Sequence, residues 1–480
     1  MADESYLVST HSEIASTFDQ LSLGPWLVTA YNLGYAIALP TYGRLCDIYG
    51  HKSTLLTAYS LFTIGCAILG MAPSIWVAMA GRLIAGMGGS GMVDLISVII
   101  ADMAPLNEVA MYRSYISIVL TLGVSSGAPL GGIMADLIGW RWSSAIQVPL
   151  ALICSIMAAM RLPSGAGKKK AEGECALTFD VAGMVFLSVT ITVLMLLCLS
   201  VGGEDASAGS NPVITIVLGV VLILSGVTFT VNEVFWANDP LIPFWLMKTR
   251  GIGLVFLSQI FILASQFGLI SNLSDLFIRA GNASNALGGL YLLPSPFGCT
   301  VGALLSGRLV KQTGKYKRVG IFSFAIGMFA YFVIIIRWNL GLKTWELMIY
   351  TFISGAAMGG LLSTQFVGLT AAAPKPQSAT AITVYYLSQQ MGIILGVTAA
   401  ATMCRQSFAN NLSQHLDTNH EITQKILSDS RFANTLPESV QAIVRMSFWK
   451  SFQFVPIFCL STLTLALPLA IYLPEWPIQA

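Results

Sequence analysis

The residues of this sequence that could do chemistry are a few charges set within long apolar runs. Arg82 and Asp94 both fall inside residues 75–103, where most other side chains are apolar or small. A charge at membrane depth is costly, so it usually faces a bundle interior or a water-filled cavity, where it can take part in proton transfer. Along one helix these two residues lie about 18 Å apart, so Arg82 needs a partner from another helix. We select Asp3 as the candidate for that second carboxylate.

The composition indicates a membrane protein. The chain has 480 residues, of which 55% are hydrophobic and only 10% are charged, with a mean hydropathy of +0.73. Soluble globular proteins carry about 25% charged residues. The 8 cysteines show no CxxC spacing and the 4 histidines form no cluster. We therefore expect neither a metal site nor a disulfide framework.

Apolar runs of membrane length recur along the chain, which predicts an all-α polytopic membrane protein. Residues 1–18 are too short and too polar to cross roughly 30 Å of hydrocarbon by themselves. Lys and Arg, among them Arg113, are more frequent in loops on the side of residues 43–53, so we assign that side to the cytoplasm. The candidate spans are 24–44, 54–71, 75–103, 113–137, 141–161, 179–201, 212–235, 252–275, 284–307, 318–338, 345–372, 378–404 and 449–473.

A short basic segment between two apolar runs occurs twice. The first copy begins at Gly43 and the second at Gly307, and each has a further glycine seven residues later, Gly50 and Gly314. Such a repeat predicts two related halves. Asp47 in the first copy could pair with a helix N-terminus or an arginine of the other half and so latch the inner gate.

The first copy resembles the cytoplasmic motif G-x-L-x-D-x-x-G-R-K of the major facilitator superfamily, with His51 in place of the usual arginine. The resemblance covers nearly the whole chain. It implies two six-helix bundles that rock about a central cavity. His51 could make the latch sensitive to pH, and the alternative is a tolerated surface change. The residues that we assign to gating are Gly43, Asp47, Gly50 and Lys52.

Two further stretches resemble motifs of the same superfamily. Arg82 begins a match to the helix 4 motif R-x-x-x-G-x-G-x, which implies a part in proton transfer for this arginine. We assign the proton coupling to Arg82 together with the carboxylates Asp94 and Asp3. Residues 123–132 resemble the helix 5 antiporter motif G-x-x-x-G-P-x-x-G-G, with the proline shifted by one position. Such glycines give a smooth face for a pivoting helix and the proline bends it, while a plain packing face is the alternative. The antiporter-motif residues are Gly123, Gly127, Pro129, Gly131 and Gly132.

The chain resembles the fungal fourteen-span drug:proton antiporters, in which two extra spans separate the halves. Residues 1–18 resemble the second half of helix 1 in that family, with Asp3 on its aspartate. We therefore expect helix 1 to be truncated here, and a short extramembrane helix is the alternative. The expected units are a first bundle at 1–161, a basic cytoplasmic linker at 162–178, the extra helices at 179–235, and a second bundle at 236–480 with an outer loop at 406–447.

Polar side chains at membrane depth in the second half are candidates for substrate contacts, because each needs a partner there. Hydrogen bonding within the core is the alternative for each of them, and for Asp94 as well. Two Asn-x-Ser sequons fall on the expected outer side and could be glycosylated. The candidate cavity residues are Gln365, Tyr386, Gln389 and Gln390, and the sequon residues are Asn282 and Asn411.

These patterns predict a transporter and not an enzyme: a proton-coupled antiporter that exports a drug, toxin or secondary metabolite across the plasma membrane. Residues 31–35 and 104–106 also resemble vacuolar transporters of basic amino acids, so vacuolar transport is an alternative. An inactive or receptor-like paralogue is a third. In each case we expect a monomer in membrane lipid with a small-molecule substrate, a proton gradient in place of any cofactor, and no nucleic-acid partner.

Overall fold

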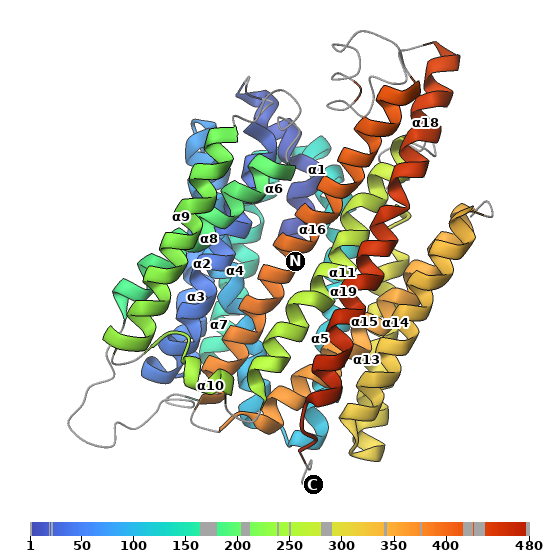
Figure 1. The fold of residues 1–480 in the computed structure, drawn as a ribbon. Coiled ribbons are helices and arrows are strands. Elements are labelled where there is room, and N and C mark those ends of the chain that lie inside the picture. The colour runs from blue at the N-terminus through green and yellow to red at the C-terminus, as the bar shows by residue number, and fades with distance from the viewer. Residues whose placement is uncertain are drawn as a thin grey trace.

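Helices form two bundles in the computed structural model (Figure 1). The structure describes residues 2–18, 20, 23–163, 180–202, 212–237, 240–248, 251–279, 290–339, 343–374, 377–415, 426 and 437–476. The first bundle comprises α1 (Ala2–Thr17), α2 (Gly24–Tyr49), α3 (His51–Gly70), α4 (Ile75–Met103), α5 (Leu106–Ile138), α6 (Trp140–Ala145) and α7 (Gln147–Arg161). The second comprises α11 (Ile252–Arg279), α13 (Pro294–Thr313), α14 (Tyr316–Asn339), α15 (Thr344–Ala372), α16 (Ser378–His415), α18 (Glu438–Phe452) and α19 (Phe454–Tyr472). Between them in sequence lie α8 (Val181–Gly202), α9 (Pro212–Val231), the π-helix η3 (Asn232–Trp236) and α10 (Phe244–Lys248).

Nine helical segments within the described residues are long and apolar enough to cross a membrane. Helices α2, α5, α8 and α13 run beside them and correspond to the other predicted spans. The prediction of an all-α polytopic fold is confirmed. Several boundaries differ from the expectation, and two of them bear on the site and the motifs. Helix α5 starts at Leu106, so Arg113 lies about two turns inside a helix and not at its surface end. Helix α13 starts at Pro294, because a proline fits the first turn, where its missing N–H is not needed.

Reciprocal glycine contacts pack helices closely in both bundles. Gly34 of α2 lies against the backbone of Leu83 in α4, and Gly86 of α4 lies against Tyr31 in α2. A side chain at either glycine would meet the neighbouring backbone, so these positions let the helices approach. The second bundle repeats the arrangement with the same three-residue spacing, which supports two related halves. The equivalent contacts are Gly298 of α13 with Phe352 of α15, and Gly355 of α15 with Ser295 of α13.

The two bundles meet mainly along two helix pairs, α2 with α16 and α5 with α13, and α4 and α5 also contact α16 and α15, respectively. Gly43 of α2 lies against Thr383 of α16, and Gly307 of α13 lies against Ser114 of α5. Hydrogen bonds near these glycines connect the two loop motifs through the short link between α4 and α5. Both motifs therefore lie on one side of the membrane, which we call the motif side.

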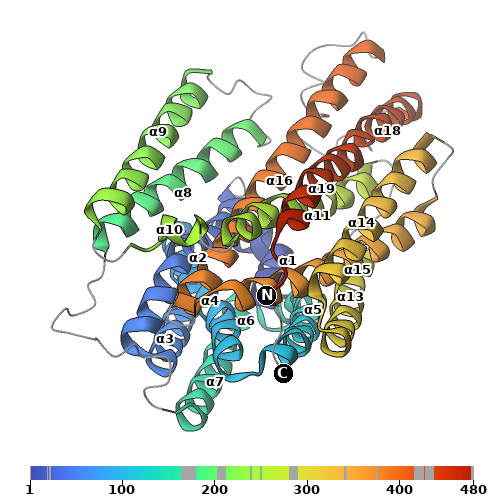
Figure 2. The same ribbon diagram turned by 60° about the horizontal axis from the view of Figure 1, so that its bottom comes forward.

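The helices α8 and α9 lie at the edge of the bundles (Figures 1 and 2). They pack against each other, and α8 also contacts α2 and α16. Apolar side chains of α9, such as Ile216 and Ile223, are about two-thirds exposed at 65% and 67%. Such a surface suits contact with lipid.

The structure describes the expected units to different extents. The basic linker 162–178 lies almost entirely outside the described residues, with only its first two residues described. The outer loop expected at 406–447 is helical at both of its ends, because α16 continues through His415 and α18 begins at Glu438.

We predict that Gly86→Ala destabilises the protein. The new Cβ would lie 2.9 Å from the carbonyl carbon of Tyr31, so α2 and α4 would have to move apart. Overpacking of this kind costs about 1–3 kcal/mol. The measurement is the thermal unfolding midpoint in detergent. Gly219→Ala in α9 is the matched control, because no heavy atom lies within 4 Å of its Cβ position. Equal midpoints for the two variants would contradict the close packing of α2 and α4.

Candidate functional site at the interface of the two bundles

Arg82 of α4 and Asp3 of α1 form a buried ion pair inside the first bundle. Nη1 of Arg82 donates to both carboxylate oxygens of Asp3, at 3.0 and 2.8 Å. The Arg82 side chain is fully buried, and that of Asp3 is 7% exposed. The Tyr31 ring lies 4.5 Å from the guanidinium carbon, measured to the ring centroid. A carboxylate and an aromatic face together therefore offset the charge of Arg82.

The guanidinium of Arg82 also has hydrogen-bonding capacity left over. Its Nε and Nη2 atoms are buried and have no partner among the described residues. Unpaired donors in a buried site attract a further acceptor, because leaving them unpaired is costly. If Asp3 takes up a proton, Arg82 loses its counter-charge. The pair therefore has the chemistry that proton exchange needs, and its role in coupling stays a prediction.

Asp94 lies apart from this pair, at the interface between the bundles. One oxygen of its carboxylate accepts a hydrogen bond from the hydroxyl of Thr383 in α16, at 2.8 Å. The residue is fully buried, and its other oxygen, Oδ1, has no partner within the described residues. The structure thus separates the three proton-coupling candidates into two places: Asp3 with Arg82, and Asp94 against the second bundle.

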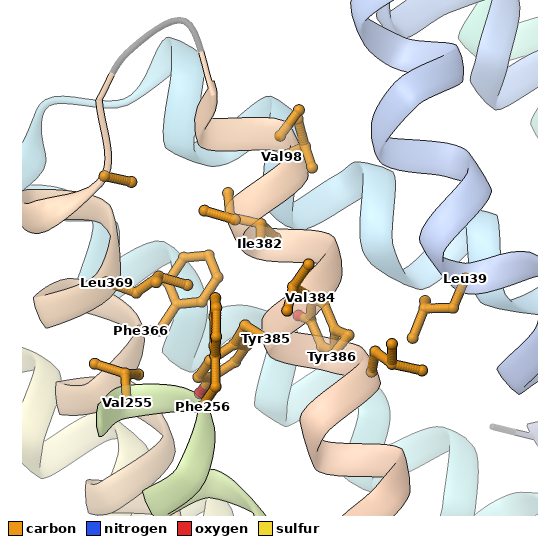
Figure 3. Packing of buried hydrophobic residues seen from close by; sticks show 14 of the residues in the cluster. Leu39, Val98, Val255, Phe256, Phe366, Leu369, Ile382, Val384, Tyr385 and Tyr386 are labelled. Carbon is orange, nitrogen blue, oxygen red and sulfur yellow. The ribbon is translucent and has the colours of Figure 1, made fainter. Parts of the chain in front are cut away.

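The structure places a further charged residue at this interface, Arg113 of α5, which the sequence analysis assigned to a surface loop. Its Nη1 donates to the hydroxyl oxygen of Ser97 at 2.9 Å and also to that of Tyr386. The Ser97 and Tyr386 hydroxyl oxygens are 2.6 Å apart. The ring of Phe366 lies 4.7 Å from the guanidinium carbon. Figure 3 shows Phe366 and Tyr386 within the apolar packing around α16. Arg113, only 7% exposed, therefore links α5 to two helices of the second bundle.

Two of the predicted gating residues lie at the contact between α2 and α16. The carboxylate of Asp47 accepts a hydrogen bond from the Thr380 hydroxyl at 3.4 Å, in the first turn of α16. A helix N-terminus favours a negative charge. One turn earlier, a Cβ on Gly43 would lie 2.7 Å from the Thr383 hydroxyl oxygen. Gly50 forms the turn between α2 and α3 with a φ of 83°, which suits glycine.

His51 begins α3 and is buried, at 3% exposed, so it is not a surface residue. Its Nδ1 lies 2.8 Å from the sulfur of Cys46, and its Nε2 lies 3.0 Å from Oδ2 of Asp102. The other oxygen of Asp102 accepts a hydrogen bond from Ser378 of α16, at 3.0 Å. The imidazole therefore connects α2, α3 and α4 to the second bundle. Lys52, the next residue, is half-buried.

The second loop motif makes its own contact across the interface. Lys311 of α13 donates to a carboxylate oxygen of Glu108, in the first turn of α5, at 2.8 Å. This hydrogen bond raises the pKa of Lys311. Gly314 ends α13 with a φ of 67°, as Gly50 ends α2. The two motifs thus form related contacts in which the residue at the matching position, Asp47 or Lys311, has the opposite charge.

The antiporter-motif residues lie in an uninterrupted stretch of α5, which packs against α1. Gly127 and Gly131 are buried, and Gly123 is half-buried. Just before the motif, the Thr121 hydroxyl lies 2.5 Å from that of Thr300 in α13. The motif stretch of α5 therefore begins next to a contact with the second bundle. Its role in antiport stays a prediction.

The structure does not gather the four candidate cavity residues in one place. Tyr386 contacts the first bundle through Arg113, whereas the amide of Gln389 donates to Gln259 of α11 at 3.2 Å. Gln390 is half-buried. Gln365 lines a pocket between α14, α15 and α19. Gln365 thus faces the helices of its own bundle, away from Tyr386.

Of the two sequons, Asn282 lies outside the described residues. Asn411 lies in the last turns of α16, and its amide donates to the Ser451 hydroxyl of α18 at 2.9 Å. A glycan on Asn411 would require that contact to open, and glycosylation stays a prediction.

The sequence matches a known protein family and is similar to individual transporters. Residues 1–397 match the family model described as Major Facilitator Superfamily. The chain is 30% identical to the Vacuolar membrane amino acid uptake transporter fnx2 of Schizosaccharomyces pombe, over 92% of this chain and 76% of that protein. It is 25% identical to the Multidrug resistance protein fnx1 of the same organism, over 94% and 85%. It is 26% identical to the Vacuolar basic amino acid transporter 2 of Saccharomyces cerevisiae, over 89% and 93%.

Two experimental structures have a similar fold. One is the proton:xylose symporter XylE, with a TM-score of 0.58 and 14% identity over 94% of this chain and 92% of that chain. The other is the human organic anion transporter MFSD10, with a TM-score of 0.56 and 15% identity over 95% and 89%.

We predict that Asp3→Asn and Arg82→Gln are each strongly destabilising and that their effects do not add. Removing one member of a buried pair leaves an uncompensated charge or an unmet group, at a cost of about 3–5 kcal/mol. Removing both leaves no unpaired charge at this site. A double-mutant cycle of thermal unfolding midpoints checks this. Additive effects would show that the pair is not coupled.

We predict that Lys311→Glu opens the interface between α5 and α13, because it places a second carboxylate beside Glu108. The measurement is labelling of Ser114→Cys by a membrane-impermeant maleimide from the motif side, after the native cysteines are replaced. Ser114 is fully buried beside Gly307, so its labelling reports the opening. Adding Glu108→Lys to Lys311→Glu restores opposite charges and should restore protection. Fast labelling of the double variant would argue against an electrostatic contact.

Proposed function

The chain belongs to the major facilitator superfamily, and on that premise we propose that it exchanges protons for an amino acid across a vacuolar membrane. Members of this superfamily are membrane transporters and not enzymes, so the chain is an integral membrane protein with a small-molecule substrate. The motif side is assigned to the cytoplasm. The proton-coupling residues are Asp3 and Arg82 in the bundle core, with Asp94 at the interface.

The similarity to fnx2 is the observation that carries the amino-acid proposal. That relative is named a vacuolar amino acid uptake transporter, and the match extends over 92% of this chain. The relative from Saccharomyces cerevisiae, named for vacuolar transport of basic amino acids, supports the same class and membrane. The proposal therefore favours the alternative of the sequence analysis over export of a drug.

The buried charges support a polar, charged substrate. Arg113 and Asp94 both reach the interface between the bundles, where a transported molecule must pass as they rock. Proton coupling gives a reason to hold Asp94 there with any cargo, whereas Arg113 has no assigned part in that coupling and so favours a charged substrate. An amino acid carries both charges in its backbone and could meet both residues.

Export of a drug or secondary metabolite is the second candidate. The relative fnx1 is named for multidrug resistance, and its match covers 94% of this chain. The glycines and proline of the antiporter-motif stretch in α5 suit either cargo, so they do not separate the two candidates.

We predict that purified protein in proteoliposomes with an acidic interior accumulates radiolabelled L-arginine. With one-for-one exchange, each pH unit across the membrane is worth about 1.4 kcal/mol, which supports roughly a tenfold accumulation. A protonophore should abolish that accumulation. Arg82→Ala and Asp94→Asn should abolish the proton movement that arginine drives, read with a pH-sensitive dye inside the vesicles.

The control is Gly219→Ala, which lies in α9 away from these residues and should accumulate arginine like the wild type. Absence of arginine accumulation in the wild type, with cells lacking the gene sensitive to a drug, would favour export. Normal proton movement in Arg82→Ala would remove that residue from the mechanism.

A further inference from the structure

Arg113 and Asp94 take part in a small group of hydrogen bonds between the bundles. Thr383 and Tyr386 stand three residues apart on α16, so their side chains share one face of that helix. The Thr383 hydroxyl donates to Asp94, and the Tyr386 hydroxyl accepts from Arg113. Ser97, three residues after Asp94 on α4, also accepts from Arg113, at 2.9 Å. Two charges of the first bundle therefore end on two neutral hydroxyls of the second.

Neutral hydroxyls satisfy these charges incompletely. Asp94 is fully buried, yet its Oδ1 has no hydrogen-bond partner in the described part of the chain. No ion pair joins Arg113 to a carboxylate among the described residues. A partner of opposite charge would add Coulomb attraction to the charge-assisted hydrogen bond that each group already makes. Each residue could therefore gain energy from a partner of opposite charge.

Both charges stay with the first bundle when the bundles part on the motif side. Arg113 lies on α5 and Asp94 on α4, whereas the hydroxyls that hold them lie on α16. Separation of α16 from α4 and α5 removes both hydroxyls together. A cation and an anion then stand beside each other on one wall of the opened interface. The partners that hold the two charges, Thr383 and Tyr386, stand one turn apart on α16, where Cβ atoms lie about 5–6 Å apart. That spacing is of the order of an amino-acid head group with a hydrogen bond at each end.

We propose that Arg113 and Asp94 recognise the α-carboxylate and α-ammonium of an amino acid when the motif side is open. In the closed interface, the Tyr386 oxygen takes the place of a carboxylate oxygen, and the Thr383 donor takes the place of an ammonium N–H. Substrate and gate thus compete for the same two groups. The Asp94 carboxylate can bind either a proton or the ammonium group of the substrate. Binding of one therefore excludes the other, as exchange of protons for substrate requires.

This inference rests on the proposed function and deepens it by naming the binding residues. The probes are L-arginine, agmatine, which lacks the α-carboxylate, and 5-guanidinopentanoate, which lacks the α-amino group. Binding is read as the ligand-induced rise in the unfolding midpoint of the purified full chain, because a bound ligand stabilises the folded state. Binding can be measured even in variants that no longer transport.

The wild type should prefer arginine over each analogue by roughly ten- to a hundredfold, as expected for losing one charged hydrogen-bonding group. Arg113→Gln should lose the preference over agmatine and keep the preference over 5-guanidinopentanoate. Asp94→Asn should do the reverse. If Arg113→Gln does not fold, Arg113→Lys keeps a cation and should retain a weakened preference over agmatine.

Thr383→Val is the control, because it removes a gate hydroxyl and leaves both charges in place. It should keep both preferences and bind arginine at least as tightly as the wild type. Equal changes in both preferences, or none, in the Arg113 and Asp94 variants would show a purely structural gate and overturn the inference. No binding or transport of arginine by the wild type would instead overturn the proposed function.

Discussion

An ionised side chain within a membrane has to find its partner inside the protein, and this constraint accounts for several contacts between the described helices. Arg82 fixes α4 to α1 through Asp3, and Arg113 fixes α5 to α15 and α16. Asp94 needs α16 in the same way. Each charge makes a contact between particular helices costly to break without a replacement. A proton or a charged substrate can be that replacement, so the charges couple helix contacts to cargo.

The two loop motifs show how related halves can form unlike contacts. Gly43 and Gly307 allow close approach at equivalent places, and Gly50 and Gly314 end the helices that carry them. The charged contacts then differ. Asp47 rests on the first turn of α16 and is 3% exposed, whereas Lys311 pairs with Glu108 near the surface, with its side chain 37% exposed. An exposed pair is screened by water and salt, so the Lys311–Glu108 contact should depend more on ionic strength than the buried contact of Asp47.

The spans and the first-bundle ion pair were accessible from the sequence, and the interface charges were only partly so. The length of the apolar runs predicts the helices directly. A buried arginine needs an acidic partner, and this requirement led to the selection of Asp3 for Arg82. Arg113 was missed because it stands near the end of an apolar run. Pro105, directly before α5, is the signal of an earlier helix start that could have placed it deeper. The position of Gln365 could not be read, because a helix that is buried on most sides gives no period to tell its faces apart.

The reciprocal glycine contacts allow the two halves to be aligned, and that alignment explains why the proposed proton chemistry belongs to the first bundle. Aligning Gly86 with Gly355 sets Thr351 of α15 at the place of Arg82, and Ser363 at the place of Asp94. A buried hydroxyl can bond to the backbone of its own helix, as Thr351 does with the Met348 carbonyl at 2.9 Å. A charged side chain cannot be satisfied by the backbone of its own helix in this way, so it needs a partner on another helix. The second bundle can therefore move as a more neutral body against charges that stay with the first, and the hydroxyls of α16 are suited to make and release those contacts.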